Sequence, residues 1–290
     1  MRLKPSSGKL GWLFLLPLGF FILVFLLTPI VGTIQSSFYQ DVAFLPKRFT
    51  GLSNYLVLFQ DSAFRQAALF TLLFVGVSVP LECLIGLIFA LVLQRSLPGK
   101  GMWRALVLIP WAIPATVSAK TFQLIFQYHD GLMNALLQGI GITNAPIHWL
   151  GGAPSAFFAL VLADAWKTAP FAAILFLAGL ASIPDDLHRQ AKVDGAHFLR
   201  RFIHITLPLL KPVITVVLLF RIIDALRVFD LNYVLTGGGP GGATTSLSLL
   251  GYQRYLSGDF GLGAAVSVLL FLSAWLFTWL YLRQARSVEA

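Results

Sequence analysis

The chain has 290 residues, of which 57% are hydrophobic and only 11% are charged. Soluble domains carry about 25% charged residues, so this composition excludes a soluble enzyme or binding domain. The apolar residues occur in runs of about 20, the length that crosses a hydrocarbon layer. The net charge of +9 fits Lys and Arg in cytoplasmic loops better than a nucleic-acid partner.

Six apolar segments predict six transmembrane helices, because helices satisfy their own backbone hydrogen bonds in lipid. The alternating strands of a membrane barrel are absent. The first segment follows Arg2, Lys4 and Lys9 and is too long for a signal-peptide core, so we expect it to be retained. The predicted spans are 10–34, 67–93, 104–126, 156–180, 212–235 and 262–282.

The distribution of basic residues predicts the orientation of these spans. With the N-terminus inside, the cytoplasmic segments hold 13 Lys and Arg and the outer loops hold four. Positive charge accumulates on the cytoplasmic side, so both termini are expected inside. The single cysteine, Cys83, lies in an apolar run, which excludes an internal disulfide and indicates a small buried hydrophobe.

The cytoplasmic segment 184–211 is too polar for lipid and too short for a domain. Pro184 is expected to begin an element, and Pro208 and Pro212 to end one. Its basic residues alone would be explained by attraction to anionic lipid headgroups. The order of its residues is more specific: it contains Arg189-Gln190-Ala191, Asp194-Gly195-Ala196 and Ile205-Thr206-Leu207-Pro208.

This order resembles the EAA loop of ABC importer permeases, in which Glu-Ala-Ala precedes Asp-Gly-Ala and Ile-Thr-Leu-Pro follows. The resemblance implies a short coupling helix that docks in a cleft of a cytoplasmic ATPase. Arg189 and Gln190 replace the family's Glu and Ala, so we expect an acidic or neutral acceptor on the ATPase opposite Arg189. The coupling residues implied are Arg189, Gln190, Ala191, Asp194, Gly195, Ala196, Leu207 and Pro208.

Four further segments resemble the larger membrane subunit of maltose-type and glycerol-phosphate-type importers. They are FTGLSNY (49–55), LIPWAIP (108–114), WKTAPF (166–171) and YVLTGGGP (233–240). The resemblance implies an all-α membrane protein with the six-helix, type I ABC importer permease fold, N-in and C-in, in the bacterial inner membrane. We expect residues 1–63 to form a tail, first helix and outer loop, and residues 64–285 a five-helix core containing the coupling loop.

The resemblance also implies the partners of the chain. These are a second, related permease subunit, two cytoplasmic ATPase subunits that bind ATP and Mg, and an extracytoplasmic solute-binding protein. The glycine run 237–242 and the pair Gly99-Lys100 lack the P-loop pattern, so this chain is not expected to hydrolyse ATP or to hold a cofactor. The run 237–242 is expected to form a tight turn instead. The five histidines show no metal spacing.

Ionisable side chains inside the spans are costly, about 2.5–3.5 kcal/mol each on insertion scales, and are therefore candidate functional positions. Three pairs have i,i+3 spacing on one helix face. One interpretation is that these pairs, and a pair of Glu82 with Lys120, only tie helices together. The charged residues within the spans are Glu82, Lys120, Asp164, Lys167, Arg221, Asp224, Arg227 and Asp230.

The functional interpretation places a substrate pathway at mid-membrane, where transporters hold their solutes. The corresponding helices of maltose-type permeases line the sugar site, and Arg221 could instead hold an anion such as a sugar phosphate. The predicted pathway residues are Asp164, Lys167, Thr168, Phe171, Arg221, Asp224, Ala225 and Val228.

The sequence thus predicts a permease for a sugar or sugar-like solute, with glycerol phosphate and a glycosyl-polyol as open alternatives. An ion-coupled secondary transporter would be expected to show inverted repeats or broken helices, and we see neither in the sequence. A membrane-embedded transferase would need an acid–base or nucleophile group near one interface, whereas the charges here lie at mid-membrane.

Overall fold

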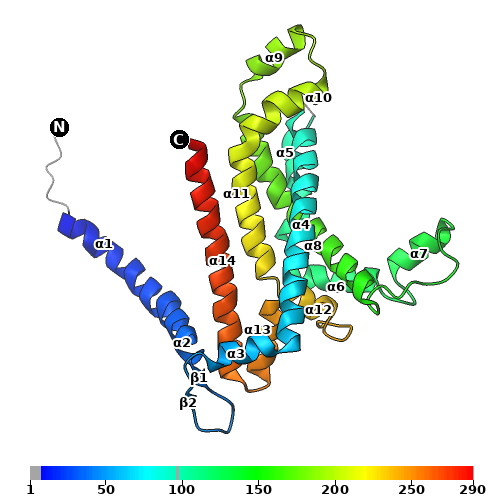
Figure 1. Ribbon diagram of the computed structural model, residues 1–290. Helices are drawn as coiled ribbons and strands as arrows, with labels where there is room; N and C mark the ends of the chain where they lie inside the picture. The colour runs from blue at the N-terminus through cyan, green and yellow to red at the C-terminus, as the bar shows by residue number, and fades with distance from the viewer. Residues whose placement is uncertain (1–7, 96–97, 290) are drawn as a thin grey trace. The chain divides into compact units, whose positions relative to one another are not determined.

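The computed structural model describes residues 8–95 and 98–289. The predicted tail residues Arg2 and Lys4 lie outside the described residues. Within the described ranges the chain consists of helices and one short hairpin (Figure 1).

The apolar helices agree with the predicted spans in number. In the described part of the chain, five helices are long and apolar enough to cross a membrane, and one bent helix pair adds a sixth span. The prediction of an all-α membrane protein is confirmed. The helices are Phe14–Ser36, Ser62–Gln94, Ala153–Ala181, Phe198–Leu226 and Phe260–Tyr281, and the bent pair is Lys100–Ala112 with Ala115–Ile125.

Two compact units divide the chain. The first contains the residues up to Asp61 together with Gly251–Leu269. Its elements are α1 (Gly8–Phe21), the π-helical segment η1 (Ile22–Leu27), α2 (Thr28–Ser36), β1 (Tyr39–Gln40), β2 (Arg48–Phe49) and α3 (Ser53–Gln60). The buried Asn54 amide donates hydrogen bonds to the carbonyls of Ser37 and Tyr39 at 2.9 and 2.8 Å, which fixes α3 against the start of the hairpin.

The second unit contains Ser62–Leu250 and the residues from Leu270 on. The predicted division at residue 63 stays a prediction. Two helices run through both units, α13 (Leu247–Leu256) and α14 (Phe260–Glu289). The remaining elements are α4 (Ser62–Gln94), α5 (Lys100–Ala112), α6 (Ala115–Ile125), α7 (Leu132–Gly139), α8 (Ala153–Ala181), α9 (Asp185–Val193), α10 (Phe198–Arg201), the π-helical segment η2 (Phe202–Thr206), α11 (Leu207–Leu226) and α12 (Asp230–Leu235).

Helix α8 is the centre of the second unit and lies beside α4 and α11 (Figure 1). Its most apolar window is 67% buried, against 28% for that of α4. Small residues allow the close packing. A Cβ added to Gly86 of α4 would lie 2.7 Å from the Cβ of Ala172 on α8, and one added to Gly179 would lie equally close to Val213 on α11.

The third predicted span is not continuous. Helices α5 and α6 meet at an angle of 87°. Pro114 causes the break, since a proline disfavours helical backbone in the residue before it, and Ile113 is extended with ψ of 134°. The span over 104–126 is therefore a broken helix, and the expectation that the chain has no broken helix is wrong.

The sequence suggested that Pro208 and Pro212 end an element, but neither does. Instead α10, η2 and α11 form one helical run from Phe198 to Leu226. The N–H of Leu207 donates to the carbonyl of Phe202, five residues back. This wider turn precedes Pro208 and accommodates a residue whose ring would clash with an ordinary helical turn. Segment η1 likewise ends two residues before Pro29.

The fifth predicted span ends earlier than expected, at Leu226 rather than residue 235. Arg227 is the C-cap of α11, while Asp230 begins the separate helix α12. The two residues therefore do not share one helix face. The glycine run that follows forms turns, as predicted, with positive φ at Gly237, Gly238, Gly241 and Gly242.

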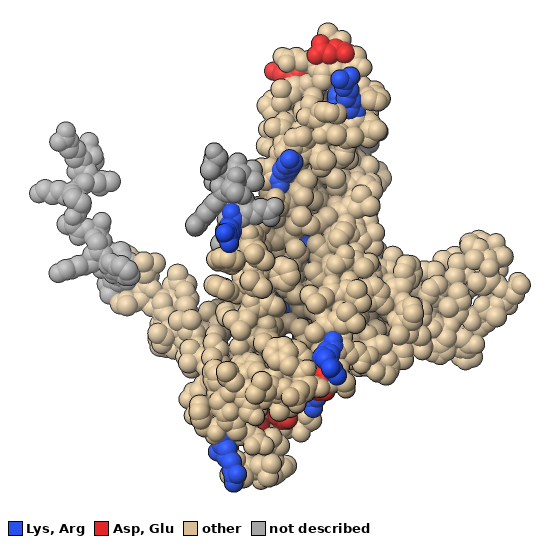
Figure 2. Space-filling model, in the orientation of Figure 1, with Lys and Arg blue, Asp and Glu red and all other residues tan. Residues whose placement is uncertain are grey.

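The surface has the character of a membrane protein. In Figure 2 most of the visible surface is tan, and the acidic and basic side chains lie in small groups, one of them over the α9 end. Many exposed side chains of α4 are large and apolar, among them Leu69, Leu73, Leu84 and Ile88. Such a surface is stable against lipid or another subunit.

Candidate translocation cavity and coupling loop

A buried arginine joins three helices of the second unit. Arg221 on α11 donates from Nε to Glu82 of α4 at 2.7 Å and from Nη1 to Asp224 at 2.6 Å. Its Nη2 lies 3.6 Å from a carboxylate oxygen of Asp164 on α8. The side chain of Arg221 is 3% exposed and that of Glu82 is fully buried. Three carboxylates therefore surround one guanidinium, which compensates the burial of its charge.

Three predicted pairings are wrong, whereas the fourth, Arg221 with Asp224, is confirmed. Among the described residues, Arg227 pairs with Asp224 at 3.2 Å and not with Asp230. Glu82 binds Arg221 and not Lys120, whose ammonium donates to Gln123 at 2.7 Å on the same helix. Lys167 makes no ion pair with Asp164 among the described residues, although the spacing is i,i+3. Spacing along a helix brings side chains within reach of one another but does not exclude better partners on neighbouring helices.

The ammonium of Lys167 binds the break between α5 and α6. It donates to the carbonyl oxygens of Ile113 at 2.6 Å and Trp111 at 3.2 Å. The last carbonyls of a helix lack partners within it, and they carry partial negative charge. Lys167 therefore caps α5 at the point where Pro114 ends it.

Seven of the eight predicted pathway residues line one cavity of about 300 Å³ between α8, α11 and the start of α12. Thr168 is buried beside Asp164 and donates to its backbone carbonyl at 2.7 Å. The lining residues are Ala115, Asp164, Lys167, Thr168, Arg221, Asp224, Ala225, Arg227, Val228, Phe229, Asp230 and Leu231.

Phe171 is the exception, because it does not line this cavity. Its ring stacks on Trp111 at 5.6 Å between centroids and meets Phe220 edge-on at 6.3 Å. Trp111 is the same residue whose carbonyl accepts from Lys167. The three rings form an aromatic group beside the helix break, and sequence reasoning did not include Trp111 or Phe220.

The cavity mixes charges of both signs. Asp164, Asp224 and Asp230 supply carboxylates, while Lys167, Arg221 and Arg227 supply cations. Oδ2 of Asp164 and Oε1 of Glu82 are buried and accept no hydrogen bond in the described structure. These two atoms are closed off behind Arg221, so the groups that a ligand could meet are the partly exposed ones, such as Asp224 and Arg227. Together they offer both acceptors and donors, which suits a ligand with several hydroxyl groups.

Sequence reasoning missed Glu82 as part of this group, although it identified the residue as a costly charge within a span. The available signal was that a carboxylate inside the membrane needs a cationic partner. Which cation meets it depends on how α4 packs against α11, and the spacing along the sequence does not contain that information.

The predicted coupling loop, residues 184–211, begins with helix α9, which has a defined end. Pro184 precedes it, as predicted, and Asp194 is its C-cap. The N–H of Ala196 donates to Ala191 at 2.9 Å and that of Gly195 to Lys192 at 3.2 Å. These two bonds, with Gly195 at φ +75°, are the Schellman motif that closes a helix. The Asp-Gly-Ala of the loop is thus a helix stop.

The predicted coupling residues occupy three positions along this loop. Arg189, Gln190 and Ala191 lie on α9, residues 194–196 form its cap, and Leu207 and Pro208 begin α11. Arg189 donates to Asp186 on its own helix at 2.6 Å, with both side chains exposed. The predicted acceptor on an ATPase remains a prediction.

Comparison with known proteins gives the family. The sequence model described as "Binding-protein-dependent transport system inner membrane component" matches residues 82–289. The trehalose/maltose transport system permease protein MalF of Thermococcus litoralis is 51% identical over 98% of this chain and 96% of its own length. The sulfoquinovosyl glycerol transport system permease protein SmoG of Agrobacterium fabrum is 38% identical over 99% of this chain and 94% of its own length.

A solved structure has the same fold. It is a chain of a bacterial alginate ABC transporter, crystallised with an alginate pentasaccharide-bound periplasmic protein. The match has a TM-score of 0.83 at 24% identity and covers 99% of this chain and 98% of the other. The chain therefore belongs to the binding-protein-dependent transport system inner membrane components and is a multi-pass inner-membrane permease subunit of an ABC importer.

Proposed function

We propose that this permease carries a neutral, hydroxyl-rich solute of the disaccharide class through the cavity of Asp164, Thr168 and Arg221. The observation that carries the proposal is the pairing of Arg221 with Glu82, Asp224 and Asp164. Its positive charge is already compensated, so the cavity offers sugar hydroxyls a set of donors and acceptors rather than a free cation.

An anionic solute such as glycerol phosphate fits this cavity less well. A phosphate would have to approach Asp164 and Asp224 in order to reach Arg221, and like charges repel strongly away from water. The 51%-identical relative is named for trehalose and maltose, which are neutral disaccharides. Its identity over 98% of this chain supports the same solute class.

The partners follow from membership of an ABC importer. The chain pairs with a second, related permease subunit, and two cytoplasmic ATPase subunits bind ATP and Mg. A solute-binding protein outside the membrane delivers the sugar. Helix α9 transmits the ATPase motion through Arg189, Gln190 and Ala191, and its cap at residues 194–196 holds the helix end in place. ATP hydrolysis takes place in the ATPase subunits, and this chain supplies the path for the solute.

Uptake into proteoliposomes tests the proposal with the assembled transporter and its binding protein. Trehalose or maltose should stimulate ATP hydrolysis, and glycerol phosphate should neither stimulate it nor compete. Asp224→Asn should lower uptake about tenfold, since a hydrogen bond from a solute hydroxyl to a charged carboxylate contributes roughly 1.5–3 kcal/mol. Asp130→Asn, which changes an exposed acid outside the cavity, is the matched control. Competition by glycerol phosphate, or full uptake by Asp224→Asn, would contradict the proposal.

A further inference from the structure

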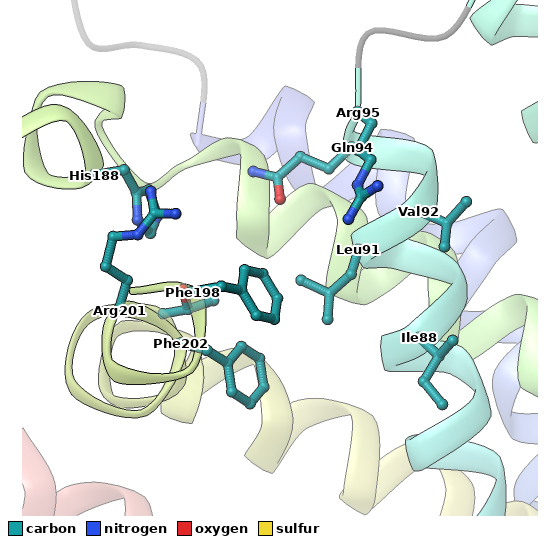
Figure 3. A pocket seen from close by; sticks show the side chains of 10 residues that line it. Ile88, Leu91, Val92, Gln94, Arg95, His188, Phe198, Arg201 and Phe202 are labelled. Carbon is teal, nitrogen blue, oxygen red and sulfur yellow. The ribbon is translucent and has the colours of Figure 1, made fainter. Parts of the chain in front are cut away.

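A second cavity of about 380 Å³ lies at the α9 end of the second unit, apart from the translocation cavity. Figure 3 shows its walls: the last turns of α4 on one side and the segment from α9 to η2 on the other. We call it the α4–α10 pocket. Its lining residues are Ile88, Leu91, Val92, Gln94, Arg95, His188, Phe198, Arg201, Phe202 and Thr206.

One end of the α4–α10 pocket is cationic. Arg95 and Arg201 approach it from opposite walls, with His188 and Gln94 beside them (Figure 3). Neither arginine has an ion-pair partner among residues 8–95 and 98–289, and Nε of Arg201 is buried without an acceptor. A buried guanidinium nitrogen without a partner is costly, so this end is suited to an anion.

The other end is apolar and opens onto the exposed outer face of α4. Ile88 and Val92 lie on the outer face of the spanning helix α4 and are each 50% exposed. Phe198 and Phe202 stack at 6.3 Å between ring centroids and face Leu91 across the pocket (Figure 3). The apolar wall therefore continues the exposed apolar surface of α4, while the two arginines lie at the cytoplasmic end that the basic residues predict.

We propose that the α4–α10 pocket binds one anionic phospholipid of the cytoplasmic leaflet. The phosphate lies between Arg95 and Arg201, and an acyl chain follows Ile88, Leu91 and Phe202. A single cationic end beside an apolar groove matches a charged headgroup with its chain, whereas a soluble anion would leave the groove exposed. Because His188 belongs to α9, the lipid connects α4 to the coupling helix and holds the two at a fixed distance.

Native mass spectrometry of the assembled transporter tests the proposal. The complex is reconstituted in phosphatidylcholine, alone or mixed with phosphatidylglycerol, and then extracted. The wild type should retain one phosphatidylglycerol for each copy of this permease, and the double variant Arg95→Gln/Arg201→Gln should lose it. The control, Arg104→Gln/Arg200→Gln, removes the same charge from nearby exposed positions outside the pocket and should retain the lipid.

Activity provides a second readout. Phosphatidylglycerol should raise solute-stimulated ATP hydrolysis severalfold in the wild type and the control, and have no such effect on Arg95→Gln/Arg201→Gln. An equal loss of this stimulation in both double variants would mean that phosphatidylglycerol acts through the general surface charge, which would overturn the proposal. Added inorganic phosphate should not replace the lipid; if it does, the site binds a soluble anion.

Photo-crosslinking distinguishes a lipid from a protein as the occupant of the α4–α10 pocket. A phosphatidylglycerol with a photoreactive acyl chain should label the peptide that contains Phe198 and Phe202 in the complete transporter. Labelling only when the ATPase subunits are removed would show that the ATPase fills the pocket, and the lipid assignment would be wrong.

Discussion

Arg221 and Glu82 lie 139 residues apart, yet the Nε of Arg221 donates to Oε2 of Glu82 at 2.7 Å with both side chains almost excluded from solvent. The contact joins α11 to α4, and the ion pair of Arg221 with Asp164 joins α11 to α8. Three of these residues, Arg221, Asp164 and Asp224, also line the proposed translocation cavity. Helix packing and the proposed solute path therefore depend on the same side chains.

Removing Arg221 alone should destabilise the subunit. Breaking a buried ion pair costs about 3–5 kcal/mol, because the remaining charge stays unpaired. Arg221→Met should thus lower the unfolding temperature of the detergent-solubilised protein and its abundance in the membrane. Asp130→Asn, at an exposed side chain outside this ion-pair group, is the control and should remain near wild type. Glu82→Leu/Arg221→Met should recover part of the loss; wild-type melting of Arg221→Met would refute this account.

Lys167 should support the break between α5 and α6. Its two bonds to the carbonyls of Ile113 and Trp111 are charge-assisted, and such a bond contributes about 1.5–3 kcal/mol. Lys167→Met is expected to lower the free energy of unfolding by a similar amount. Lys120→Met removes an ammonium from α6 whose one hydrogen bond among the described residues is to Gln123, and it should have little effect. Equal thermal shifts in the two variants would show that the cap is unimportant.

Two glycines of α4 should differ in their tolerance of a side chain. A Cβ at Gly86 would lie 2.7 Å from Ala172, whereas a Cβ at Gly76 would have no atom within 4 Å. Overpacking costs about 1–3 kcal/mol, so Gly86→Ala should lower the melting temperature and Gly76→Ala should not. If both variants melt as the wild type does, α4 and α8 can separate without cost.

The number of spans and their approximate positions could be predicted from the sequence, because apolar run length reports directly on membrane crossing. The break at Pro114 was missed, although Pro110 and Pro114 flank it. Proline is tolerated within many membrane helices, and α4 contains Pro80 without a break. The sequence alone does not distinguish these cases, since what stabilises the break is Lys167, a residue of another helix.

In the candidate site, too, some features could be predicted from the sequence and others could not. The residues of the cavity could be predicted from charge and depth, whereas their pairings could not. Glu82 was expected to meet Lys120 and instead binds Arg221, because the rotation of α4 against α11 decides which cation it faces. Local motifs are different: the Asp-Gly-Ala sequence of the coupling loop specifies its own cap, and only hydrogen bonds within the loop are needed.

The left-handed conformation of Gly195 should be essential to coupling. Its φ of +75° closes α9, and an added Cβ would have no atom within 4 Å, so the requirement is conformational rather than steric. A left-handed residue with a side chain costs about 1–2 kcal/mol, and asparagine is the best tolerated after glycine. Gly195→Val should therefore abolish uptake and solute-stimulated ATP hydrolysis at normal membrane abundance, while Gly195→Asn should retain most of both.

A matched control for this prediction is Gly101→Val, because Gly101 has helical backbone and equally open surroundings. It should transport normally, which would exclude a general effect of adding a β-branched side chain at this end of the protein. Uptake and ATP hydrolysis are measured together in proteoliposomes, with membrane abundance determined by immunoblot. Should Gly195→Asn fail as completely as Gly195→Val, the ATPase must approach the backbone of Gly195 directly, and the conformational explanation would be wrong.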